Sequence, residues 1–358
     1  MVNENPLQIL RVVPHNSVHA TGGLATNRRH CGEDVVQRRR AGDPEPLHFR
    51  RRMIFALVAQ HATGTNVALA SRSWPGAESM ILTPREALER LQPGDVALGR
   101  LDVKPTLDGV DDGVAELAQL AARGVRVLNG PRTLLAAHDK LLTARALIQA
   151  GVPHPATTLF TAGDETPPLE PPVVIKPRFG SWGADVFRCD DGESLRRCLD
   201  LLPEKHWFRT QGAIVQDLIP PRGWDLRLIV AGGRVIGAVS RVAAPGEWRT
   251  NVALGAVRAP VFEPPAEACD LAIAAADAVD GHLVGVDLLP TPAGGYVVLE
   301  LNGACDFVDT YSSEDDVFAS AILALAETAG GVPALLPHAI EESVADEFLE
   351  AAETPPAS

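Results

Sequence analysis

Cysteine is scarce in this chain of 358 residues, and its five cysteines are odd in number and widely spaced: Cys31, Cys189, Cys198, Cys269 and Cys305. No CxxC pair occurs, so the sequence indicates neither a zinc site nor a disulfide framework, and reduced thiols in a cytoplasm are the simpler explanation. The chain also lacks an apolar run long enough to cross a bilayer. Its first apolar stretch, LQILRVV, is interrupted by Arg11, which argues against a signal peptide. We therefore expect a cytoplasmic location and no membrane partner.

Common signatures of catalysis and nucleotide binding are absent as well. There is no GxGxxG fingerprint of a dinucleotide-binding fold and no GK[ST] of a Walker A loop. No convincing Ser/His/Asp or Cys/His arrangement for nucleophilic catalysis occurs either. A net charge of −14 argues against general affinity for nucleic acid. The remaining composition, 46% hydrophobic and 22% charged, is that of an ordinary globular protein, and the length allows more than one packed unit.

The first 52 residues differ from the rest in charge. They contain nine arginines against five acidic residues and no sustained apolar period, so we expect residues 1–52 to be a disordered basic leader. A basic arm that binds RNA or an acidic partner is one explanation. A start of translation at Met53, which opens a good strand pattern, is the simpler one. At the other end, residues 331–358 are expected to form a polar helix and a loose tail.

The most informative stretch is VGVDLLPTPAGGYVVLELNGACDF, residues 284–307. Asp287 follows one strand pattern, and Glu300 and Asn302 end another. Residues two apart on a strand face the same way, and an antiparallel neighbour can bring Asp287 to the same point. Three oxygen ligands without His or Cys suit a hard cation such as Mg²⁺, which completes its octahedron with water and phosphate oxygens. The alternative is a solvated strand end with ordinary polar residues.

Upstream, PVVIKPRFGSWG (residues 172–183) places Lys176 at the end of a β-branched run, before a glycine-rich turn. Gly180, Ser181 and Gly183 of this turn would let backbone N–H groups approach phosphate oxygens, and the lysine ammonium adds a point charge. Taken alone, a hairpin with a solvated lysine is the better explanation of this stretch.

The apolar strand that follows, VQDLI, stops at a Pro-Pro break, where free backbone N–H and C=O groups could read an adenine edge. Asp225 and Arg227 then share one strand face by the period of two. A structural ion pair between these two residues is the alternative. It leaves unexplained why charge recurs at strand ends along this path, with Arg241 and Arg249 next.

The order of these elements resembles the ATP-grasp superfamily, and more narrowly its branch of ribosomal-protein-S6 glutamate ligases (RimK) and lysine-biosynthesis ligases (LysX). The resemblance covers about residues 53–330 and rests on several stretches in the expected order. These are HDKLLTARALIQAGVPHP, VVIKPRFGSWG, QDLI, WDLRLIV, SRVAAPGEWRTN, VGVDLL and VLELN. GSWG and the tryptophan before Arg249 are more similar to the LysX side.

The resemblance implies a nucleotide site. The positions of Lys140 and Lys176 contact phosphates in the family, and those of Asp217 and Leu218 lie at the adenine hinge. The remaining positions expected in the nucleotide or phosphate environment are Asp225, Arg249, Thr250 and Asn251.

The resemblance also implies a metal and a catalytic group, with ATP and Mg²⁺ or Mn²⁺ as cofactors. Asp287, Glu300 and Asn302 match the magnesium ligands. Arg241 matches the arginine that steadies the acyl phosphate and the tetrahedral intermediate. We expect Arg227 to reach the same place from the neighbouring strand.

The implied activity is ATP-dependent, ADP-forming carboxylate–amine ligation through an acyl phosphate. The resemblance favours an amino acid such as glutamate, joined to a peptide, a carrier-protein tail or a small metabolite, and we expect a homo-oligomer. The alternatives are a nucleotide-binding regulatory or scaffold module without turnover, and an acid–thiol ligase. The chain departs from the family where Asp217 replaces the usual hinge glutamate, and after Asn251, where VALGA replaces an arginine or histidine before paired glycines. The second departure weakens any claim to the family's substrate.

We therefore predict an α/β (α+β) ATP-grasp fold. Alternating strands (53–59, near 79–82, 96–99, 125–128) and helices (near 64–72, 84–91, 112–123) predict a small α/β unit. This unit, over residues 53–135, resembles the family's preATP-grasp domain. Residues 136–330 should form the ATP-grasp domain, with lobes of about 136–218 and 219–330 that clamp ATP. Lys140 lies near the start of a helix over 138–150, where the helix dipole and the lysine can both meet phosphate. Arg100 is a candidate for the substrate side, and an ordinary solvated arginine is as well supported.

Overall fold

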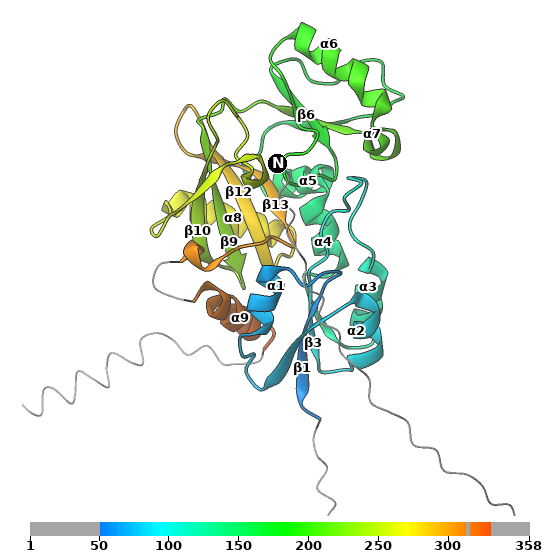
Figure 1. Cartoon of the computed structure of the whole chain (residues 1–358), viewed down its shortest axis with the longest axis vertical. Coiled ribbons are helices and arrows are strands. Elements are labelled where there is room, and N and C mark those ends of the chain that lie inside the picture. The colour runs from blue at the N-terminus through cyan, green and yellow to red at the C-terminus, as the bar shows by residue number, and fades with distance from the viewer. Residues whose placement is uncertain (1–50, 313–315, 331–358) are drawn as a thin grey trace, which may run out of the picture. The chain divides into compact units, whose positions relative to one another are not determined.

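A computed structural model describes residues 51–312 and 316–330 (Figure 1). The expected leader up to residue 50 and the expected C-terminal helix and tail lie outside the described residues. Within the described part the chain forms three β-sheets with flanking helices, which confirms the predicted α/β class. No helix in this part is long and apolar enough to cross a membrane.

The first sheet is parallel, in the strand order β2-β1-β3-β4. Its elements are β1 (Met53–Val58), α1 (Gly64–Ala70), β2 (Ala77–Leu82), α2 (Pro84–Arg90), β3 (Val96–Gly99), α3 (Val114–Ala122) and β4 (Arg126–Leu128). The apolar runs of β1 and β3 are largely buried, as expected where crossover helices cover a parallel sheet. The predicted alternation of strands and helices is confirmed here, with ends that differ by one or two residues.

Arg51, which the sequence places in the basic leader, contacts this first sheet. Its Nη1 lies 2.7 Å from Oδ1 of Asp95, a buried carboxylate in the loop before β3. Asp95 also accepts the backbone N–H groups of Ile54 and Gln92. The pair holds the chain just ahead of β1 against that loop.

The second sheet is antiparallel, in the order β5-β8-β6-β7. Two helices precede it, α4 (Pro131–His138) and α5 (Lys140–Gln149). Its elements are β5 (Thr157–Phe160), β6 (Val173–Pro177), β7 (Phe187–Cys189), α6 (Gly192–Leu201), η1 (Leu202–Glu204), α7 (His206–Gln211) and β8 (Ala213–Asp217). Helix α6 packs on β7, and α7 lies against β6. The sheet therefore has one helix-covered face, and β6 and β8, its two central strands, end in Lys176-Pro177 and Asp217.

The third sheet is antiparallel, in the order β11-β10-β9-β12-β13. Its strands are β9 (Trp224–Ala231), β10 (Arg234–Val242), β11 (Val257–Pro260), β12 (Leu283–Pro290) and β13 (Tyr296–Asn302). The remaining elements are η2 (Val252–Leu254), α8 (Ala266–Ala278), η3 (Asp309–Tyr311) and α9 (Val317–Thr328).

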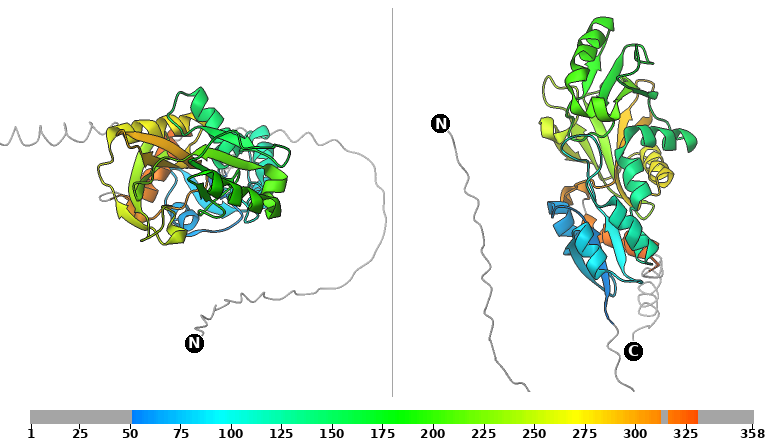
Figure 2. Two further views of the ribbon diagram at one scale, coloured as in Figure 1. Left: turned by 90° about the horizontal axis from the view of Figure 1, so that it is seen from above. Right: turned by 90° about the vertical axis from the view of Figure 1, so that its right-hand side faces the viewer.

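Alternating side chains give the third sheet two different faces. On one face, Leu228 and Val230 pack against the alanines of α8, and α5 lies beside that helix (Figure 2). On the other face, Ile229 and Ala231 pack with η3 and α9. Arg227 lies on this second face, two residues before Ile229 along β9. The second face therefore carries an apolar end under α9 and a charged end beyond it.

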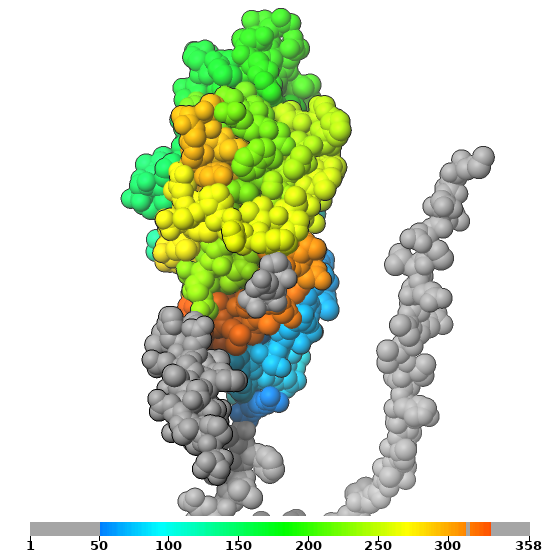
Figure 3. Space-filling view, turned by 90° about the vertical axis from the view of Figure 1, so that its left-hand side faces the viewer, coloured from blue at the N-terminus to red at the C-terminus, as the bar shows by residue number. Residues whose placement is uncertain are grey.

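Specific contacts join the first and third sheets. Asn129, which follows β4, is fully buried, and its Nδ2 donates to the carbonyls of Leu283 (2.6 Å) and Gly303 (3.2 Å). Helix α9 packs against α1, where Arg72 pairs with Asp316, and the two segments adjoin as orange and blue surface in Figure 3. These contacts fix the end of β13 relative to the parallel sheet.

Candidate active site

The charged residues of the third sheet stand in rows across its strands. Backbone pairing puts Asp287 of β12 opposite both Glu300 of β13 and Arg227 of β9. In the next row, Arg241 of β10 lies opposite Asp225 of β9. Residues directly opposite each other in an antiparallel pair project from the same face. The predicted approach of Asp287 to Glu300 through an antiparallel neighbour is therefore confirmed.

A shift of register aims Glu300 at this face. Asp287 lies opposite Glu300, but the next residue, Leu288, lies opposite Val298, so Leu299 is an extra residue in β13. Val298 and Leu288 are buried together on the α8 face. In a regular strand Val298 and Glu300 would share one face, so this β-bulge separates a core residue from a site residue. The simple alternation assumed from the sequence misses the bulge.

Four of these side chains form a buried network of ion pairs. Arg227 holds Asp287 in a bidentate contact, with Nε 2.6 Å from Oδ1 and Nη2 2.7 Å from Oδ2. Arg241 bridges two carboxylates, with Nε 2.8 Å from Oδ1 of Asp225 and Nη2 2.8 Å from Oδ2 of Asp287. Asp225 also accepts the hydroxyl of Thr250. The alternative of a pair between Asp225 and Arg227 is wrong, because each carboxylate finds its arginine on a neighbouring strand.

The network sets the charge of its carboxylates. Burial opposes ionisation of Asp287, but the guanidinium groups of Arg227 and Arg241 outweigh burial and lower the pKa of Asp287 below its usual range. For Asp225, burial dominates and raises the pKa, although Arg241 acts in the opposite direction. Removing one partner from such a network leaves a buried charge without compensation.

Lys176 is buried, with 5% of its surface exposed, so the alternative of a solvated lysine is wrong. Its Nζ donates to Oε1 of Gln216 at 2.8 Å, and Gln216 in turn donates to the hydroxyl of Thr157. Burial lowers the pKa of Lys176 to about 8, while the carboxylate of Glu300 raises it. Gln216 is a site residue that the motifs of the sequence do not indicate. The sequence feature that could have indicated it is a polar residue within an otherwise apolar, buried strand.

Lys140 opens α5, but the helix N-terminus itself is occupied, which corrects the prediction that the helix dipole meets phosphate there. Asp139 caps the helix and accepts the N–H of Leu141 at 3.0 Å, while the N–H of Lys140 donates to the carbonyl of Arg178. Only the Lys140 ammonium extends to the site, where it donates to the carbonyl of Gly180 at 2.8 Å and lies 3.5 Å from Oε2 of Glu300.

The glycine turn after β6 closes against the loop after β10. Gly183 has a φ of +74°, and a Cβ there would lie 2.7 Å from Oδ1 of Asn251, so this close approach requires glycine. Nη1 of Arg249 donates to the carbonyl of Gly183 at 2.9 Å. Glu247 holds the same guanidinium at 2.8 Å, and its pKa is lowered to about 2, chiefly by that hydrogen bond to Arg249.

The hinge after β8 differs from the prediction of free backbone groups. The N–H of Asp217 donates to Ala156 and that of Leu218 to Pro172, because β8 is a central strand with neighbours on both sides. Among the described residues, the N–H of Ile219 has no hydrogen-bond partner, and Pro220 has none to offer. The donor available at the hinge is therefore one residue further along than predicted.

Two adjoining pockets gather the predicted residues. The first lies between the second and third sheets and is lined by Lys140, Lys176, Gly180, Ser181, Gly183, Asp217, Leu218, Asp225, Arg241, Arg249, Thr250, Asn251, Asp287 and Glu300. The remaining two predicted residues, Arg227 and Asn302, line the second pocket. The two pockets share wall residues, among them Lys140, Arg241 and Glu300.

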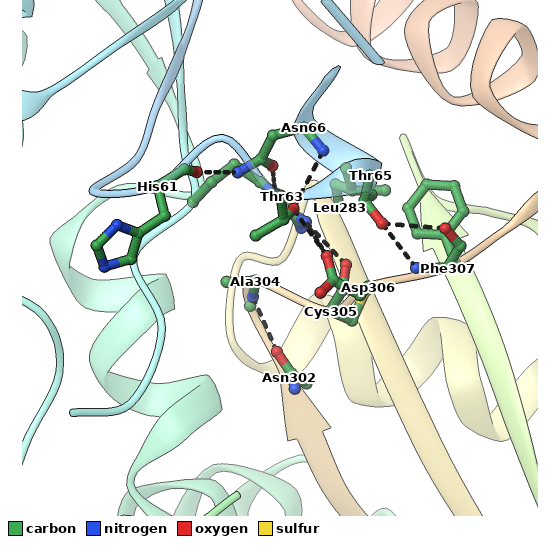
Figure 4. A network of polar contacts seen from close by, with 12 residues as sticks. His61, Thr63, Thr65, Asn66, Leu283, Asn302, Ala304, Cys305, Asp306 and Phe307 are labelled. Atoms are coloured by element: carbon green, nitrogen blue, oxygen red, sulfur yellow. Dashed lines mark hydrogen bonds and ion pairs between the residues drawn. The ribbon is translucent and has the colours of Figure 1, made fainter. Parts of the chain in front are cut away.

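The loop after Asn302 is hydrogen-bonded to the start of α1, the helix that follows β1 (Figure 4). The side-chain oxygen of Asn302 accepts the N–H of Ala304 at 2.9 Å, and the Thr63 hydroxyl donates to Oδ1 of Asp306 at 2.9 Å. Arg100 lies beneath this loop and donates to the carbonyl of Cys305 at 2.8 Å. The alternative of a solvated Arg100 is wrong, because the side chain is buried and supports this loop.

The donor set near β13 fits a hard cation that is completed by a substrate. In the residues that the structure describes, no group of three His, Cys, Asp or Glu side chains could hold a metal alone. Glu300 and Asn302 offer oxygen atoms two residues apart, beside the two lysines. Mg²⁺ commonly takes one or two protein carboxylates plus phosphate oxygens, which this arrangement suits. Asp287 already accepts guanidinium hydrogens from two arginines, so an ion bound there would share its oxygens with them.

Comparisons with known proteins agree with this geometry. The model of the RimK-like ATP-grasp domain matches residues 137–318. A relative described as glutamate–LysW ligase ArgX of Sulfurisphaera tokodaii is 31% identical over 228 residues, which cover 60% of this chain and 78% of the relative. Human N-acetylaspartylglutamate synthase A is 31% identical over 225 residues, which cover 60% of this chain and 55% of that protein.

Solved structures show the same fold. A RimK domain ATP-grasp protein from Sphaerobacter thermophilus superposes with a TM-score of 0.54 at 22% identity, over 76% of this chain and 98% of that one. D-alanine–D-alanine ligase of Bacillus anthracis gives a TM-score of 0.56 at 17% identity, over 78% and 96% of the two chains.

The fold and the matched residues define an ATP-grasp protein, of the class of ATP-dependent carboxylate–amine ligases. Within that class, the chain belongs to the RimK-like ATP-grasp family. The predicted resemblance, fold and enzyme class are thereby confirmed.

Proposed function

We propose that this protein is an ADP-forming ligase that joins a carboxylate to the amine of an amino acid through an acyl phosphate. The observation that carries the proposal is the common wall of the two pockets, which Lys140, Arg241 and Glu300 line from both sides. A nucleotide in the first pocket and a carboxylate in the second would meet at these side chains.

In the first step, the lysines hold the phosphates. Lys176 and Lys140 would exchange their present neutral acceptors, the Gln216 amide and the Gly180 carbonyl, for phosphate oxygens. A carboxylate oxygen of the substrate then attacks the γ-phosphorus, the bond to the β–γ bridging oxygen breaks, and ADP leaves. The lysines neutralise charge on the transferred group, and no nucleophilic side chain is needed.

In the second step, the arginines act on the acyl group. The amine nitrogen attacks the acyl carbon, the carbon–oxygen bond to phosphate breaks, and the amine loses a proton to the departing phosphate. Arg241 and Arg227 both line the second pocket, and Asp225 and Asp287 fix their guanidinium groups. Fixed cations stabilise the oxyanion of the tetrahedral intermediate without reorganisation.

The hinge and the metal complete the nucleotide site. We assign the adenine edge to the backbone of residues 217–219, with the N–H of Ile219 as donor. Glu300 and Asn302 would hold Mg²⁺ or Mn²⁺, and Asp287 would add an oxygen shared with its arginines. When bound, such an ion neutralises the β- and γ-phosphate oxygens.

The relatives support the substrate class. Those described as glutamate–LysW and α-aminoadipate–LysW ligases favour an amino acid, with glutamate first, and a peptide or carrier-protein tail as acceptor.

Product analysis tests the proposal. The full chain is incubated with ATP, Mg²⁺ and the standard amino acids, alone and with short peptide acceptors, and nucleotides are separated by chromatography. We expect ADP and phosphate in equal amounts with ligated product, and none from Glu300→Gln, whose circular dichroism should be unchanged. AMP and pyrophosphate as stoichiometric products would contradict the proposed mechanism.

A further inference from the structure

A third arginine extends the charged row of the third sheet. Arg258 of the edge strand β11 lies directly opposite Arg241 in the antiparallel pairing, so both side chains project from the same face. Arg241 is neutralised by Asp225 and Asp287. Arg258 has no carboxylate partner among the described residues, and its Nε is buried without a hydrogen-bond acceptor. Like charges directly opposite each other destabilise a sheet unless an anion lies between or beside them.

A buried hydroxyl group near these arginines also lacks a partner. Tyr311 of η3 is 1% exposed, and its hydroxyl oxygen has no hydrogen-bond partner in the part of the chain that the structure describes. Burial raises the pKa of Tyr311, while the nearby charges of Arg227 and Arg258 act against burial. The phenol therefore stays protonated at neutral pH and remains a donor. Buried donors without acceptors are rare in folded proteins. Tyr311 lines neither pocket, so its hydroxyl is a second unpaired donor in this region and is not placed against a ligand.

The second pocket carries both signs of charge. Arg227, Arg241 and Arg258 line it from the third sheet, and Asp102 and Asp306 line it from the side of the parallel sheet. Arg258 does not line the first pocket, where the two lysines stand. An anion bound at Arg258 is thus placed with the second substrate and not with the nucleotide.

From this geometry we infer that Arg258 binds a second carboxylate of the amino-acid substrate, so that the second pocket selects acidic amino acids. The inference rests on the proposed function and adds the residue that sets its specificity. The guanidinium of Arg258 offers unpaired N–H donors, and a carboxylate accepts two of them side by side.

Equilibrium dialysis of the full chain with labelled L-glutamate, L-aspartate and L-glutamine tests the assignment without turnover. We expect wild-type protein to bind an acidic amino acid at least 10-fold more tightly than L-glutamine. Arg258→Ala and Arg258→Met should weaken binding of the acidic amino acid by about 10- to 100-fold, with ATP affinity unchanged. Arg258→Lys should retain part of the preference for the acidic amino acid. Arg234→Ala, on the same sheet but lining neither pocket, is the matched control and should change nothing.

Several outcomes would overturn the inference. They are an unchanged preference in the Arg258→Ala and Arg258→Met proteins, a loss of ATP affinity in place of amino-acid affinity, and no binding of any of the three amino acids by the wild type. ADP release, measured in parallel, reports on the proposed function separately. Amino-acid-dependent ADP release that persists with unaltered specificity in Arg258→Ala would leave the ligase standing and remove Arg258 from its substrate site.

Discussion

Two cations of the first pocket, Lys176 and Lys140, donate to neutral acceptors. Lys176 donates to the amide of Gln216, and Lys140 donates to a backbone carbonyl, with Glu300 3.5 Å away. Such contacts can be exchanged for phosphate oxygens, whose charge-assisted hydrogen bonds are stronger. The cations are therefore already in position to bind a polyanion such as a triphosphate.

Lys176 should make ATP binding dependent on pH. Its pKa of about 8 lies below the usual lysine value, so the free protein loses this proton as the pH rises above about 8. Bound phosphates favour the ammonium form, so binding should take up a proton there, and ATP affinity should fall as the pH rises from 8 to 9.5. Calorimetry of ATP binding in two buffers of different ionisation enthalpy measures this proton uptake.

The control for this prediction is Lys176→Met, which keeps the volume and removes the charge. ATP affinity should drop by about 10- to 100-fold, and the pH dependence above 8 should disappear. The variant should be no less stable than the wild type at pH 7, because the buried ammonium is costly below its folded pKa. An equal proton uptake in both proteins would assign the titration to another group.

Arg241→Ala should abolish ligation and also destabilise the fold. Asp225 is 0% exposed and would keep only the Thr250 hydroxyl as partner, so we expect a loss of about 3–5 kcal/mol in the free energy of unfolding by urea. The loss should shrink as the pH falls, because a buried carboxylate without a cation binds a proton more readily in the folded state.

The double variant Arg241→Ala with Asp225→Asn separates the two effects. Stability should recover by most of the loss, since the unpaired charge is gone, while ADP formation stays absent. A double variant that regains ligation would show that Arg241 acts only through the stability of the network.

At the scale of elements, the start of α5 combines a cap with the site. Asp139 is buried, accepts N–H groups from the first turn and is bound by Arg178, with Nη2 2.6 Å from Oδ2. An aspartate just before a helical pattern is a common N-cap, so the sequence carried the signal that this N-terminus is closed. The cap fixes the direction in which Lys140 leaves the helix.

Asp139→Ala should therefore lower the free energy of unfolding by more than the loss of an ordinary helix cap does. Asp191→Ala, which removes the exposed cap of α6, is the matched control and should cost about 1 kcal/mol. For Asp139→Ala we expect the free energy of unfolding to fall by about 2–3 kcal/mol, because Arg178 also loses its hydrogen-bond partner. Urea unfolding of the two variants gives the comparison, and equal losses would mean that the Arg178 pair contributes nothing.

The sequence predicts elements better than it predicts their partners. Strands and helices from β1 to β4 follow from hydrophobic period and capping residues, and the site strands follow from short apolar runs that end in charge. Which carboxylate binds which arginine depends on the register between β9, β10 and β12, and Arg227 and Asp287 lie 60 positions apart. For the same reason, the positions of Gln216 and Arg258 in the site emerge only once the strands are paired.

At the scale of the whole molecule, Asn129 is a junction between the first and third sheets. Its amide donates to two carbonyls and accepts the N–H groups of His282 and Leu283, all at 3.2 Å or less. The division into domains at residues 53–135 and 136–330 stays a prediction. A buried side chain that satisfies four backbone groups is expected to couple the parts that it joins.

Asn129→Ala should lower the free energy of unfolding by about 3 kcal/mol or more, since buried backbone groups lose their partners. Asn129 has a φ of 45°, so part of the loss is backbone strain. Asn129→Gly relieves this strain and should recover about 1 kcal/mol. Chemical denaturation of the wild type, Asn129→Ala and Asn129→Gly separates the loss of hydrogen bonds from the backbone strain. An Asn129→Ala protein as stable as the wild type would show that the Asn129 contacts do not stabilise the fold.

The two different faces of the third sheet determine what happens when its strands pair in the wrong register. Arg227, Asp287 and Glu300 share one face with the apolar residues under α9, and the other face is covered by α8. A one-residue slip between strands would turn these charges into the alanine-lined interior and the aliphatic residues out to water. A molecule with mispaired strands therefore cannot keep a partly active site. After refolding, the specific activity of a sample should report directly the fraction of molecules whose strands have paired correctly.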